Sequence, residues 1–535
     1  MKKWYKKSVV YQIYPLTFKD GNGDGIGDLR GIIDEIPYLK SLGINAVWLS
    51  PINCSPMNDN GYDISDYLNI NPLFGTIDDF KELITKLHQN SIKLIMDLVV
   101  NHSSSEHRWF KEAIKNKNSK YHDYYFFKDK LNNWTSFFGG SAWEYNKDTN
   151  EYYLHLFDKS QPDLNWDNPQ LRDEIKKILK YWLDLGVDGF RCDVINVISK
   201  KEGLPDGNPN SGVIGIEHYA NGVNLHKYLK ELYDDVFSKY DAFTVGECGI
   251  QSIEDTIKLT TNELDTIFNF EHFSIDELNN KWNYKLINIS DLKKSFAEIQ
   301  RRYNEFNIWN TLVLENHDQP RSISRYGDLK YRYESASLLA AYVFLLQGTP
   351  FIYQGEEIGM TNYPFNNIDD FKDLESINYY QENINKVNQE RLFDQLKHKS
   401  RDNARSVMQW NNEVNAGFSK TKTNLLINPN YKSINVEKDL KEEYSLIDFY
   451  KELIKLKIHN KVFIYGKYFD YDLQANDHFI YERTYNDDTY LVVGNLTNQN
   501  NNIVLPYKAK KILSNLKEEL DYFLPYQVKI YRKEG

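Results

Sequence analysis

Ionisable side chains stand at the ends of several short apolar runs in this sequence, and carboxylates predominate among them. They are Asp193, Glu247 and Asp318, accompanied by His102, Arg191 and His317. A single carboxylate after a strand is often only the N-cap of the next helix. Three carboxylates, two histidines and an arginine on one rim would cost stability if they served packing alone. The pattern therefore indicates a catalytic site in which carboxyl groups do the chemistry.

The elements that must position these residues are short β-rich runs that alternate with amphipathic helical patterns, which is typical of parallel βαβ units. Eight such runs predict an α/β fold of the (β/α)8 type, a TIM barrel. In that fold the active site lies where the strands end, because only there do the βα loops converge. The predicted strands are Val9–Tyr14, Ala46–Ser50, Leu94–Val99, Gly189–Asp193, Phe243–Gly246, Thr266–Phe270, Thr311–Leu314 and Phe351–Tyr353.

Segments outside this alternation predict further parts. Residues 102–170, after the third strand, are too many for one crossover and rich in aromatic residues and Asn, which predicts an inserted subdomain on the barrel rim. The barrel itself is predicted from residues 1–101 and 171–457, with the polar segment 362–435 as a roof over its face. In residues 458–535, β-type runs divided by Asn and Asp turns predict a C-terminal antiparallel β domain.

Several of these segments resemble the motifs of the α-amylase superfamily, in order and with plausible spacing. The four general motifs are Asp97–His102, Gly189–Asp193, Gly246–Glu247 and Asn316–Asp318. Further segments resemble the oligo-1,6-glucosidase subfamily, and these are Gln161–Asn165, Arg401–Arg405, Met408–Trp410 and Ile427–Tyr431. Because these landmarks run from the first strand to about Tyr431, the resemblance covers most of the chain.

The resemblance implies a retaining glycosidase in which Asp193 is the nucleophile, Glu247 the acid/base and Asp318 the transition-state stabiliser. Retaining hydrolysis needs one carboxylate to attack the anomeric carbon and a protonated carboxyl about 5–5.5 Å away. Strand alternation places Arg191 on the same inward face as Asp193, so we expect its guanidinium to keep Asp193 ionised. Glu247 must stay protonated, through burial or through the nearby charge of Asp318.

The resemblance also implies which residues contact the sugar. His102 and His317 are expected to hydrogen-bond hydroxyl groups of the glucose that is cleaved off. Asp59 is expected to clamp this glucose, and the ring of Tyr62 to form the floor of its pocket. Arg401 is expected to close the pocket and Phe157 to line it, although the guanidinium of Arg405 is an alternative to that of Arg401. Arg191 is expected to lie beneath the nucleophile and to complete the substrate-binding set.

The expected activity is exo-acting hydrolysis of short α-glucosides. In this subfamily Val after the nucleophile tends to accompany α-1,6 cleavage, and Val194 is that residue. The alternatives are an α-1,4-preferring α-glucosidase, a trehalose-6-phosphate hydrolase and a non-catalytic sugar-binding homologue. A trehalose-6-phosphate hydrolase would need a basic patch, for which Lys200 and Lys201 are the nearby candidates. The intact carboxylates argue against a non-catalytic homologue. The Arg-Leu-Asp-Arg type loop of sucrose isomerases is missing, since Ser324–Asp328 stands there.

A loop after the first strand has oxygen side chains at alternate positions with glycines between them, which lets one loop wrap a hard cation. Gly31 occupies the twelfth position, where an EF-hand has a bidentate Glu, so the loop is not an EF-hand. It resembles the Ca²⁺ loop of the subfamily, which implies a structural calcium ion, and the alternative is a Gly/Asp turn without metal. The implied ligands are the side chains of Asp20, Asn22, Asp24 and Asp28 and the carbonyl of Ile26.

Composition narrows the possible partners and locations. The chain has 535 residues and a formal net charge of −11 at pH 7. That charge argues against nucleic acid, because such binding depends on Lys and Arg that neutralise phosphates. No apolar run of 18 or more residues predicts a membrane span, and Met1–Lys7 lacks the features of a signal peptide. Three cysteines form no disulfide framework. We therefore expect a cytoplasmic protein whose partner is a small oligosaccharide.

Overall fold

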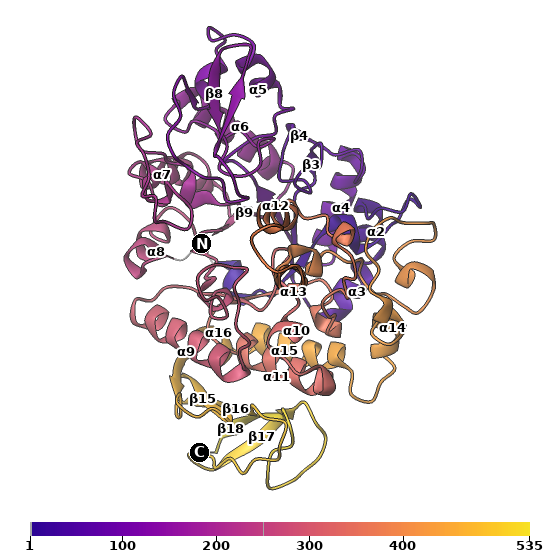
Figure 1. Ribbon diagram of the computed structural model, residues 1–535. Helices are drawn as coiled ribbons and strands as arrows, with labels where there is room; N and C mark the ends of the chain where they lie inside the picture. Colours follow the sequence, from indigo (N-terminus) through magenta and orange to yellow (C-terminus); the bar gives the residue numbers. More distant parts are fainter. Residues whose placement is uncertain (1–2, 250, 535) are drawn as a thin grey trace.

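A computed structural model describes residues 3–249 and 251–534, and its centre is an eight-stranded parallel sheet (Figure 1). The strand order is β11-β10-β9-β5-β2-β1-β13-β12. The two end strands also meet, because Thr311 Oγ1 donates to the Ile267 carbonyl (3.2 Å) and Thr266 Oγ1 to that of Trp309 (2.6 Å). The predicted TIM barrel is confirmed, and each predicted strand is present. The strands are β1 (Val10–Ile13), β2 (Ala46–Leu49), β5 (Lys93–Leu98), β9 (Gly189–Cys192), β10 (Phe243–Gly246), β11 (Thr266–Ile267), β12 (Thr311–Val313) and β13 (Thr349–Tyr353).

Alternation along these strands builds two cores. Val10, Trp48 and Ile95 pack with other inward residues inside the barrel, whereas Tyr11 and Val47 face the surrounding helices. Most of the surrounding helices begin at a residue whose side chain accepts from a free backbone amide. Thr76, for example, forms a capping box with Asp79 at the start of α4. The main surrounding helices are α2 (Leu29–Asp34), α3 (Ile36–Leu42), α4 (Ile77–Gln89), α6 (Pro169–Asp184), α7 (Leu225–Asp235), α8 (Ile253–Leu259), α9 (Ile289–Glu305), α11 (Arg332–Phe344) and α15 (Leu446–His459).

Between β5 and α6 the chain leaves the barrel and forms a small antiparallel sheet, at the top of Figure 1. Its strands are β6 (Phe127–Lys128), β7 (Trp143–Asn146) and β8 (Glu151–Leu154), in the order β6-β8-β7. Buried residues of this part, including Trp134 and Leu156, pack with Val197 and Tyr219 from the loop after β9. The excursion therefore rests against the loops that carry the site.

The C-terminal part is an antiparallel five-stranded sheet at the bottom of Figure 1. It meets the barrel at α11, where the Tyr481 hydroxyl donates to the carbonyl of Tyr342 (2.9 Å). Its strands are β14 (Lys467–Asp470), β15 (His478–Tyr485), β16 (Asp488–Asn495), β17 (Ala509–Ser514) and β18 (Val528–Lys533), in the order β14-β15-β16-β18-β17.

The polar segment after β13 contains two helices, α12 (Leu374–Asn383) and α13 (Gln389–Lys399), followed by the short helix η10 (Arg401–Ala404). We call residues 362–435 the roof segment, because several of its side chains line the cavity above the barrel. Asp373 and Asn388 cap its two helices through their side chains. The sequence did not predict these helices, since polar composition hides the pattern on which such predictions depend.

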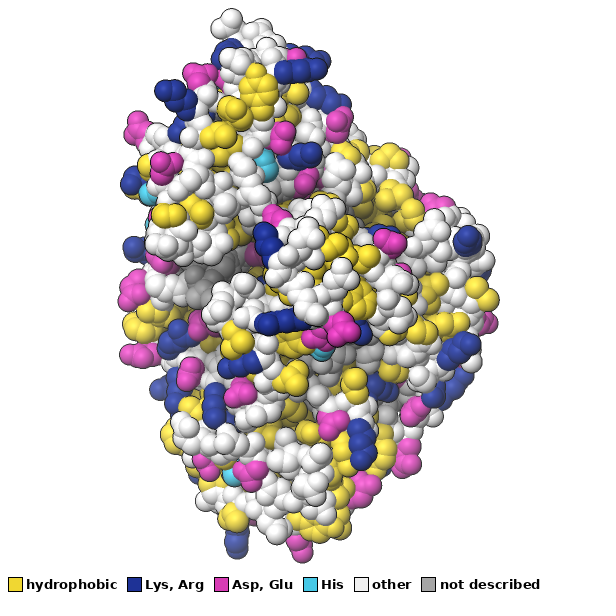
Figure 2. Space-filling model, in the orientation of Figure 1, with side chains coloured by type: hydrophobic (Ala, Val, Ile, Leu, Met, Phe, Trp, Pro, Cys, Tyr) yellow, Lys and Arg dark blue, Asp and Glu magenta, His cyan; other side chains and the backbone are white. Residues whose placement is uncertain are grey.

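No helix in the described ranges is long and apolar enough to cross a membrane. On the face drawn in Figure 2, Lys and Arg side chains are interspersed with Asp and Glu and gather into no basic stripe.

Candidate active site

A small cavity of about 100 Å³ lies where β9 and β10 end, and we call it the inner cavity. Its walls come from the barrel, the excursion after β5 and the roof segment. Nearly all the predicted carboxylate and sugar-contacting residues border it. The lining residues are Asp59, Tyr62, His102, Phe138, Phe157, Gln161, Asp193, Val194, Glu247, Asp318 and Arg401.

A larger cavity of about 650 Å³, the outer cavity, adjoins it. The two share several lining residues, so they communicate. Val194 and Glu247 are among those shared, which places them at the junction between the two cavities. The shared residues are Phe138, Phe157, Val194, Glu247, Asp318 and Arg401.

Arg191 binds three carboxylates at the floor of the site. Its Nη1 lies 2.8 Å from Asp97 Oδ1 and also contacts Asp193 Oδ1, and its Nη2 lies 2.7 Å from Glu247 Oε2. Strand alternation explains the arrangement, because Arg191 and Asp193 face the barrel interior while Cys192 packs outward in the helix-facing core. The two carboxylates nearest the cavity are therefore held by one guanidinium.

One cation shared by three carboxylates does not neutralise each of them. Burial raises the pKa of Glu247 to about 7, Arg191 opposes this, and the negative charges of Asp193 and Asp318 raise it further. Burial also raises the pKa of Asp193 in spite of Arg191. The expectation that Arg191 alone keeps Asp193 ionised is thus too simple, because Asp97 and Glu247 draw on the same guanidinium. The pKa values of Asp193 and Glu247 are therefore both raised to about 7.

Val194 directs its backbone N–H toward Glu247. Its φ of 36° and ψ of 39° are left-handed, which is a strained conformation for a β-branched residue. In this conformation its N–H donates to Glu247 Oε2 (3.1 Å), the oxygen that also contacts Arg191. Because Oε2 accepts this hydrogen bond and faces the Arg191 cation, the neutral carboxyl carries its proton more favourably on Oε1.

Asp318 has the opposite electrostatic setting. Burial by itself would raise its pKa, but His317, Arg401 and Arg405 outweigh burial and hold it well below its usual range. Burial lowers the pKa of His317, so its ring is neutral with the proton on Nε2. This nitrogen lies 2.6 Å from the Tyr62 hydroxyl oxygen and 3.0 Å from Asp318 Oδ2. Gln12 Nε2 lies 2.8 Å from His317 Nδ1 and fixes this tautomer by donating to it.

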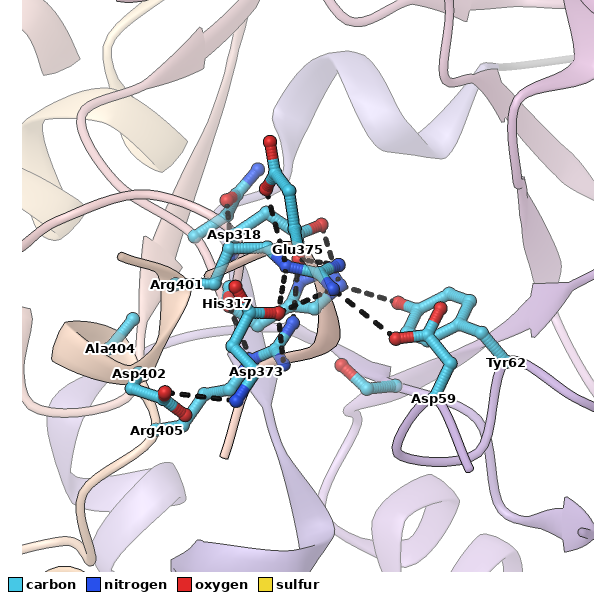
Figure 3. Close-up of polar contacts among 12 residues, drawn as sticks. Asp59, Tyr62, His317, Asp318, Asp373, Glu375, Arg401, Asp402, Ala404 and Arg405 are labelled. Atoms are coloured by element: carbon cyan, nitrogen blue, oxygen red, sulfur yellow. Dashed lines mark hydrogen bonds and ion pairs between the residues drawn. The ribbon is translucent and has the colours of Figure 1, made fainter. Parts of the chain in front are cut away.

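Arg401 and Arg405 both reach Asp318 (Figure 3). Their positions show which of the two guanidiniums borders the pocket, a question that the sequence left open. Arg405 Nη2 lies 2.9 Å and Arg401 Nη1 3.3 Å from Asp318 Oδ1. Only Arg401 borders the cavities, where its Nη2 lies 3.3 Å from Asp59 Oδ1. The guanidinium at the cavity wall is therefore that of Arg401, while Arg405 supports Asp318 from behind.

This geometry agrees with what the chain resembles. Residues 12–466 match the family described as "Alpha amylase, catalytic domain". The chain belongs to the α-amylase family. The oligo-1,6-glucosidase of Parageobacillus thermoglucosidasius is 47% identical over 530 residues, which cover 95% of this chain and 94% of that protein.

Solved structures of the α-amylase family match nearly the whole chain. The trehalose-6-phosphate hydrolase of Bacillus licheniformis has a TM-score of 0.92 and 44% identity, and the match covers 99% of each chain. The isomaltulose synthase of Klebsiella sp. LX3 has a TM-score of 0.96 and 38% identity, again over 99% of each chain.

Two residues expected to touch sugar lie behind the site of this α-amylase family member. Arg191 is 1% exposed and His317 is fully buried, and neither lines a cavity. Arg191 is covered by the carboxylates it binds, and His317 by Tyr62, whose ring stacks on it at 5.4 Å. Both contact residues that line the inner cavity, and their own contact with sugar stays a prediction.

Two residues that line the inner cavity were missing from the predicted set. Gln161 donates from Nε2 toward Asp59 Oδ2 (3.2 Å), and Phe138 packs beside Phe157. Gln161 stands in a motif that the sequence did single out, so that motif was an available signal. Phe138 carries no sequence signal, since nothing distinguishes it from the other aromatic residues of the excursion.

The predicted calcium loop is held by its own hydrogen bonds. Asp28 accepts from the amides of Gly21 and Asn22 and caps α2 through Gly31, and Asp20 accepts from the amides of Gly23 and Gly25. Within the described residues no group of three or more His, Cys, Asp or Glu side chains converges as metal ligands do. The oxygen-only donor set, which includes Asn22 and the Ile26 carbonyl, still suits the chemistry of a hard cation.

Proposed function

We propose that this protein is a retaining exo-acting α-glucosidase that prefers α-1,6 bonds in short oligosaccharides. The observation that carries the proposal is the inner cavity, in which Asp193 and Glu247 share one guanidinium and Asp318 stands ionised opposite them. The family match and the 47% identity to an oligo-1,6-glucosidase support it.

In the first step the ionised Asp193 attacks the anomeric carbon of the glucose bound in the inner cavity. Glu247 Oε1 gives its proton to the glycosidic oxygen, so the aglycone leaves into the outer cavity as a neutral alcohol. Asp318 stabilises the positive charge that develops on the sugar ring.

In the second step water takes the place of the aglycone. Glu247, now a carboxylate, removes a proton from this water as it attacks the anomeric carbon and displaces Asp193. Glucose is released with the same anomeric configuration as the substrate. The shift of Glu247 toward a pKa of about 7 suits this double role, because the group can both give and take a proton near neutral pH.

Contacts between distant segments support exo action. Asp59, from the loop between β3 (Asn53–Cys54) and β4 (Asp66–Ile70), meets Arg401 of the roof segment. This contact bridges the wall of the inner cavity, which then accepts one terminal sugar of a chain. An endo-acting enzyme needs an open cleft in that place.

The first prediction concerns substrate choice. We expect kcat/KM to be higher on isomaltose than on maltose, with little activity on starch, and sucrose hydrolysed without isomaltulose formation. The reason is that Val194 at the cavity junction crowds the second sugar, and the extra rotatable carbon of an α-1,6 bond lets that sugar swing clear. Parallel initial-rate assays on purified protein test it, with trehalose-6-phosphate in the same panel.

Val194→Ala and Val194→Thr provide the matched test of the reason. Either change should raise maltose cleavage relative to isomaltose cleavage by about tenfold, the scale of a small change in a pocket. An unchanged ratio would show that Val194 has no part in linkage choice. A wild type that prefers maltose would favour the α-1,4 alternative.

Trehalose-6-phosphate hydrolysis is the second candidate, because a solved hydrolase of that kind matches 99% of the chain. The charges argue against it. Lys200, one of the two candidates for the basic patch, is fully buried and lies 2.6 Å from Asp163, and neither Lys200 nor Lys201 lines either cavity. The lysines that do border the outer cavity already pair with carboxylates, Lys281 with Glu375 and Lys399 with Asp276. A rate on trehalose-6-phosphate above that on isomaltose would establish this alternative.

We also propose that Asp20–Asp28 binds a structural calcium ion, which is the second prediction. The loop lies outside the lining of both cavities, so the ion would stabilise folding without joining the chemistry. A ligand at about 100 times its dissociation constant adds about 2.7 kcal/mol to the free energy of unfolding. Chelation should lower the melting temperature and leave the initial rate at 25 °C nearly unchanged. Identical melting curves for protein shown to be metal-free and for calcium-loaded protein would refute the site.

A further inference from the structure

Two guanidinium groups at the end of the roof segment reach the carboxylates of the inner cavity. Arg401 lies 3.3 Å from both Asp59 and Asp318, and Arg405 lies 2.9 Å from Asp318. The two arginines are only 8% and 6% exposed. Buried cations this close repel each other unless an anion lies between them.

Asp373 is that anion, and in Figure 3 it lies beside both guanidiniums. Its Oδ1 accepts from Arg401 Nε at 2.7 Å and lies 2.5 Å from Nη2, so one carboxylate oxygen faces two nitrogens of the guanidinium. The same oxygen lies 3.6 Å from Arg405 Nη1. Burial alone would raise the pKa of Asp373, but Arg401, Arg405 and Lys281 outweigh it and hold the carboxyl ionised.

The carboxylate of Asp373 is itself fixed. The side chain is fully buried, and its Oδ2 accepts from the amide (3.0 Å) and hydroxyl (2.7 Å) of Ser376 in the first turn of α12. Asp402 accepts from the backbone amide of Asp373 (3.0 Å), which ties this turn to the segment that carries Arg401. The bonds from Arg401 to Asp373 are shorter than those to Asp59 and Asp318. Asp373 therefore determines where the guanidinium of Arg401 sits.

We propose that Asp373 is a positioning residue that orients Arg401 toward the terminal glucose. Held by Asp373, Arg401 presents Nη1 and Nη2 at the edge of the cavity and makes only long contacts to Asp59 and Asp318. Those two carboxylates then keep lone pairs for sugar hydroxyls. Without the charge at position 373, Arg401 moves onto Asp59 and Asp318 and competes with the sugar for their oxygens. The proposal rests on the proposed function only in taking glucose as the occupant.

Asp373→Asn tests this, because asparagine keeps the shape and the oxygen that caps α12 but loses the charge. We expect kcat/KM on isomaltose to fall about 10²-fold, the cost of misplacing a positioning group. KM and the dissociation constant of glucose should each rise about tenfold, since a charged hydrogen-bonding partner is lost. Asp369→Asn removes the charge of an exposed carboxylate in the same segment. It should leave kcat/KM, KM and the glucose dissociation constant unchanged.

A double-variant cycle separates positioning from folding. Arg401→Met should itself weaken glucose binding, and adding Asp373→Asn to it should change KM and the glucose dissociation constant less than twofold, because Asp373 then has nothing left to orient. This double variant also removes the unpaired buried charge, so it tests the proposal even if Asp373→Asn folds poorly. If the effects of the two substitutions on KM and on the glucose dissociation constant multiply, Asp373 acts independently of Arg401 and the proposal is wrong.

Equilibrium measurements distinguish this proposal from the proposed function. A poorly folded variant has fewer active molecules, which lowers the apparent kcat but not KM or the dissociation constant. Unchanged KM and glucose affinity in Asp373→Asn would therefore overturn the positioning role. Calorimetric binding of glucose needs no turnover, so a wild type that binds glucose without hydrolysing isomaltose would refute only the activity.

Discussion

Asp193→Asn is expected to abolish hydrolysis of every α-glucoside, with kcat reduced by about 10⁴-fold or more, the scale seen when a nucleophile is removed. The substitution removes the attacking charge and leaves the shape of the side chain almost unchanged. Arg191 retains its contacts with Asp97 and Glu247, so the site should remain assembled. Burial raises the pKa of Asp193, which means that its charge is costly in the folded protein. The neutral variant should therefore melt no lower than the wild type.

Initial rates on isomaltose and a melting curve, recorded side by side, check this expectation. Asp173→Asn is a matched control, because it makes the same change in an exposed carboxylate of α6 that pairs only with Lys176. It should keep full activity. Activity of Asp193→Asn within tenfold of the wild type would refute the assignment of the nucleophile, since an amide cannot attack the anomeric carbon at that rate.

Glu247→Gln is expected to lose about 10²–10⁴-fold in kcat/KM on isomaltose, the usual contribution of general acid catalysis. The pH profile of the wild type should show the same group. The pKa of Glu247 is raised to about 7, so the protonated form dominates below that pH and is lost above it. The rate on isomaltose should therefore fall as the pH rises through about 7.

The leaving group supplies the control for the Glu247 prediction. A nitrophenyl α-glucoside with a good leaving group needs little protonation, so the alkaline fall in kcat/KM should shrink, and Glu247→Gln should lose much less activity on it. Azide should rescue Glu247→Ala on that substrate alone, because azide can replace the water but not the missing acid. Equal losses on both substrates would show that Glu247 is not the proton donor.

The barrel and its carboxylates were predictable because both depend on local patterns. Each strand is a short apolar run, and parallel strands bring their C-terminal ends to one face, so residues such as Asp193 and Glu247 had to meet there. Alternation within β9 likewise predicted that Arg191 lies with Asp193 and that Cys192 packs outward, as the structure shows. The spacing of the motifs then identified the family, which the match over residues 12–466 confirms.

Other features depend on contacts that no local pattern records. The left-handed backbone of Val194, the buried pair of Lys200 with Asp163 and the place of His317 behind Tyr62 became visible only in the folded chain. The sharing of Arg191 among three carboxylates also became visible only in the folded chain. Because of it, the expectation that Arg191 alone keeps Asp193 ionised had to be corrected.

Asp373 shows most plainly what the sequence alone did not reveal. In the sequence it is one carboxylate in a polar segment, more than a hundred residues from Asp193. Its proposed role rests on burial and on two arginines that the packing of the roof segment brings to it. The sequence alone therefore identified the carboxylates that we propose to react, because strand periodicity and motif spacing are local. Only the tertiary structure decided which groups orient them and how they ionise, because burial and charge pairing depend on the whole fold.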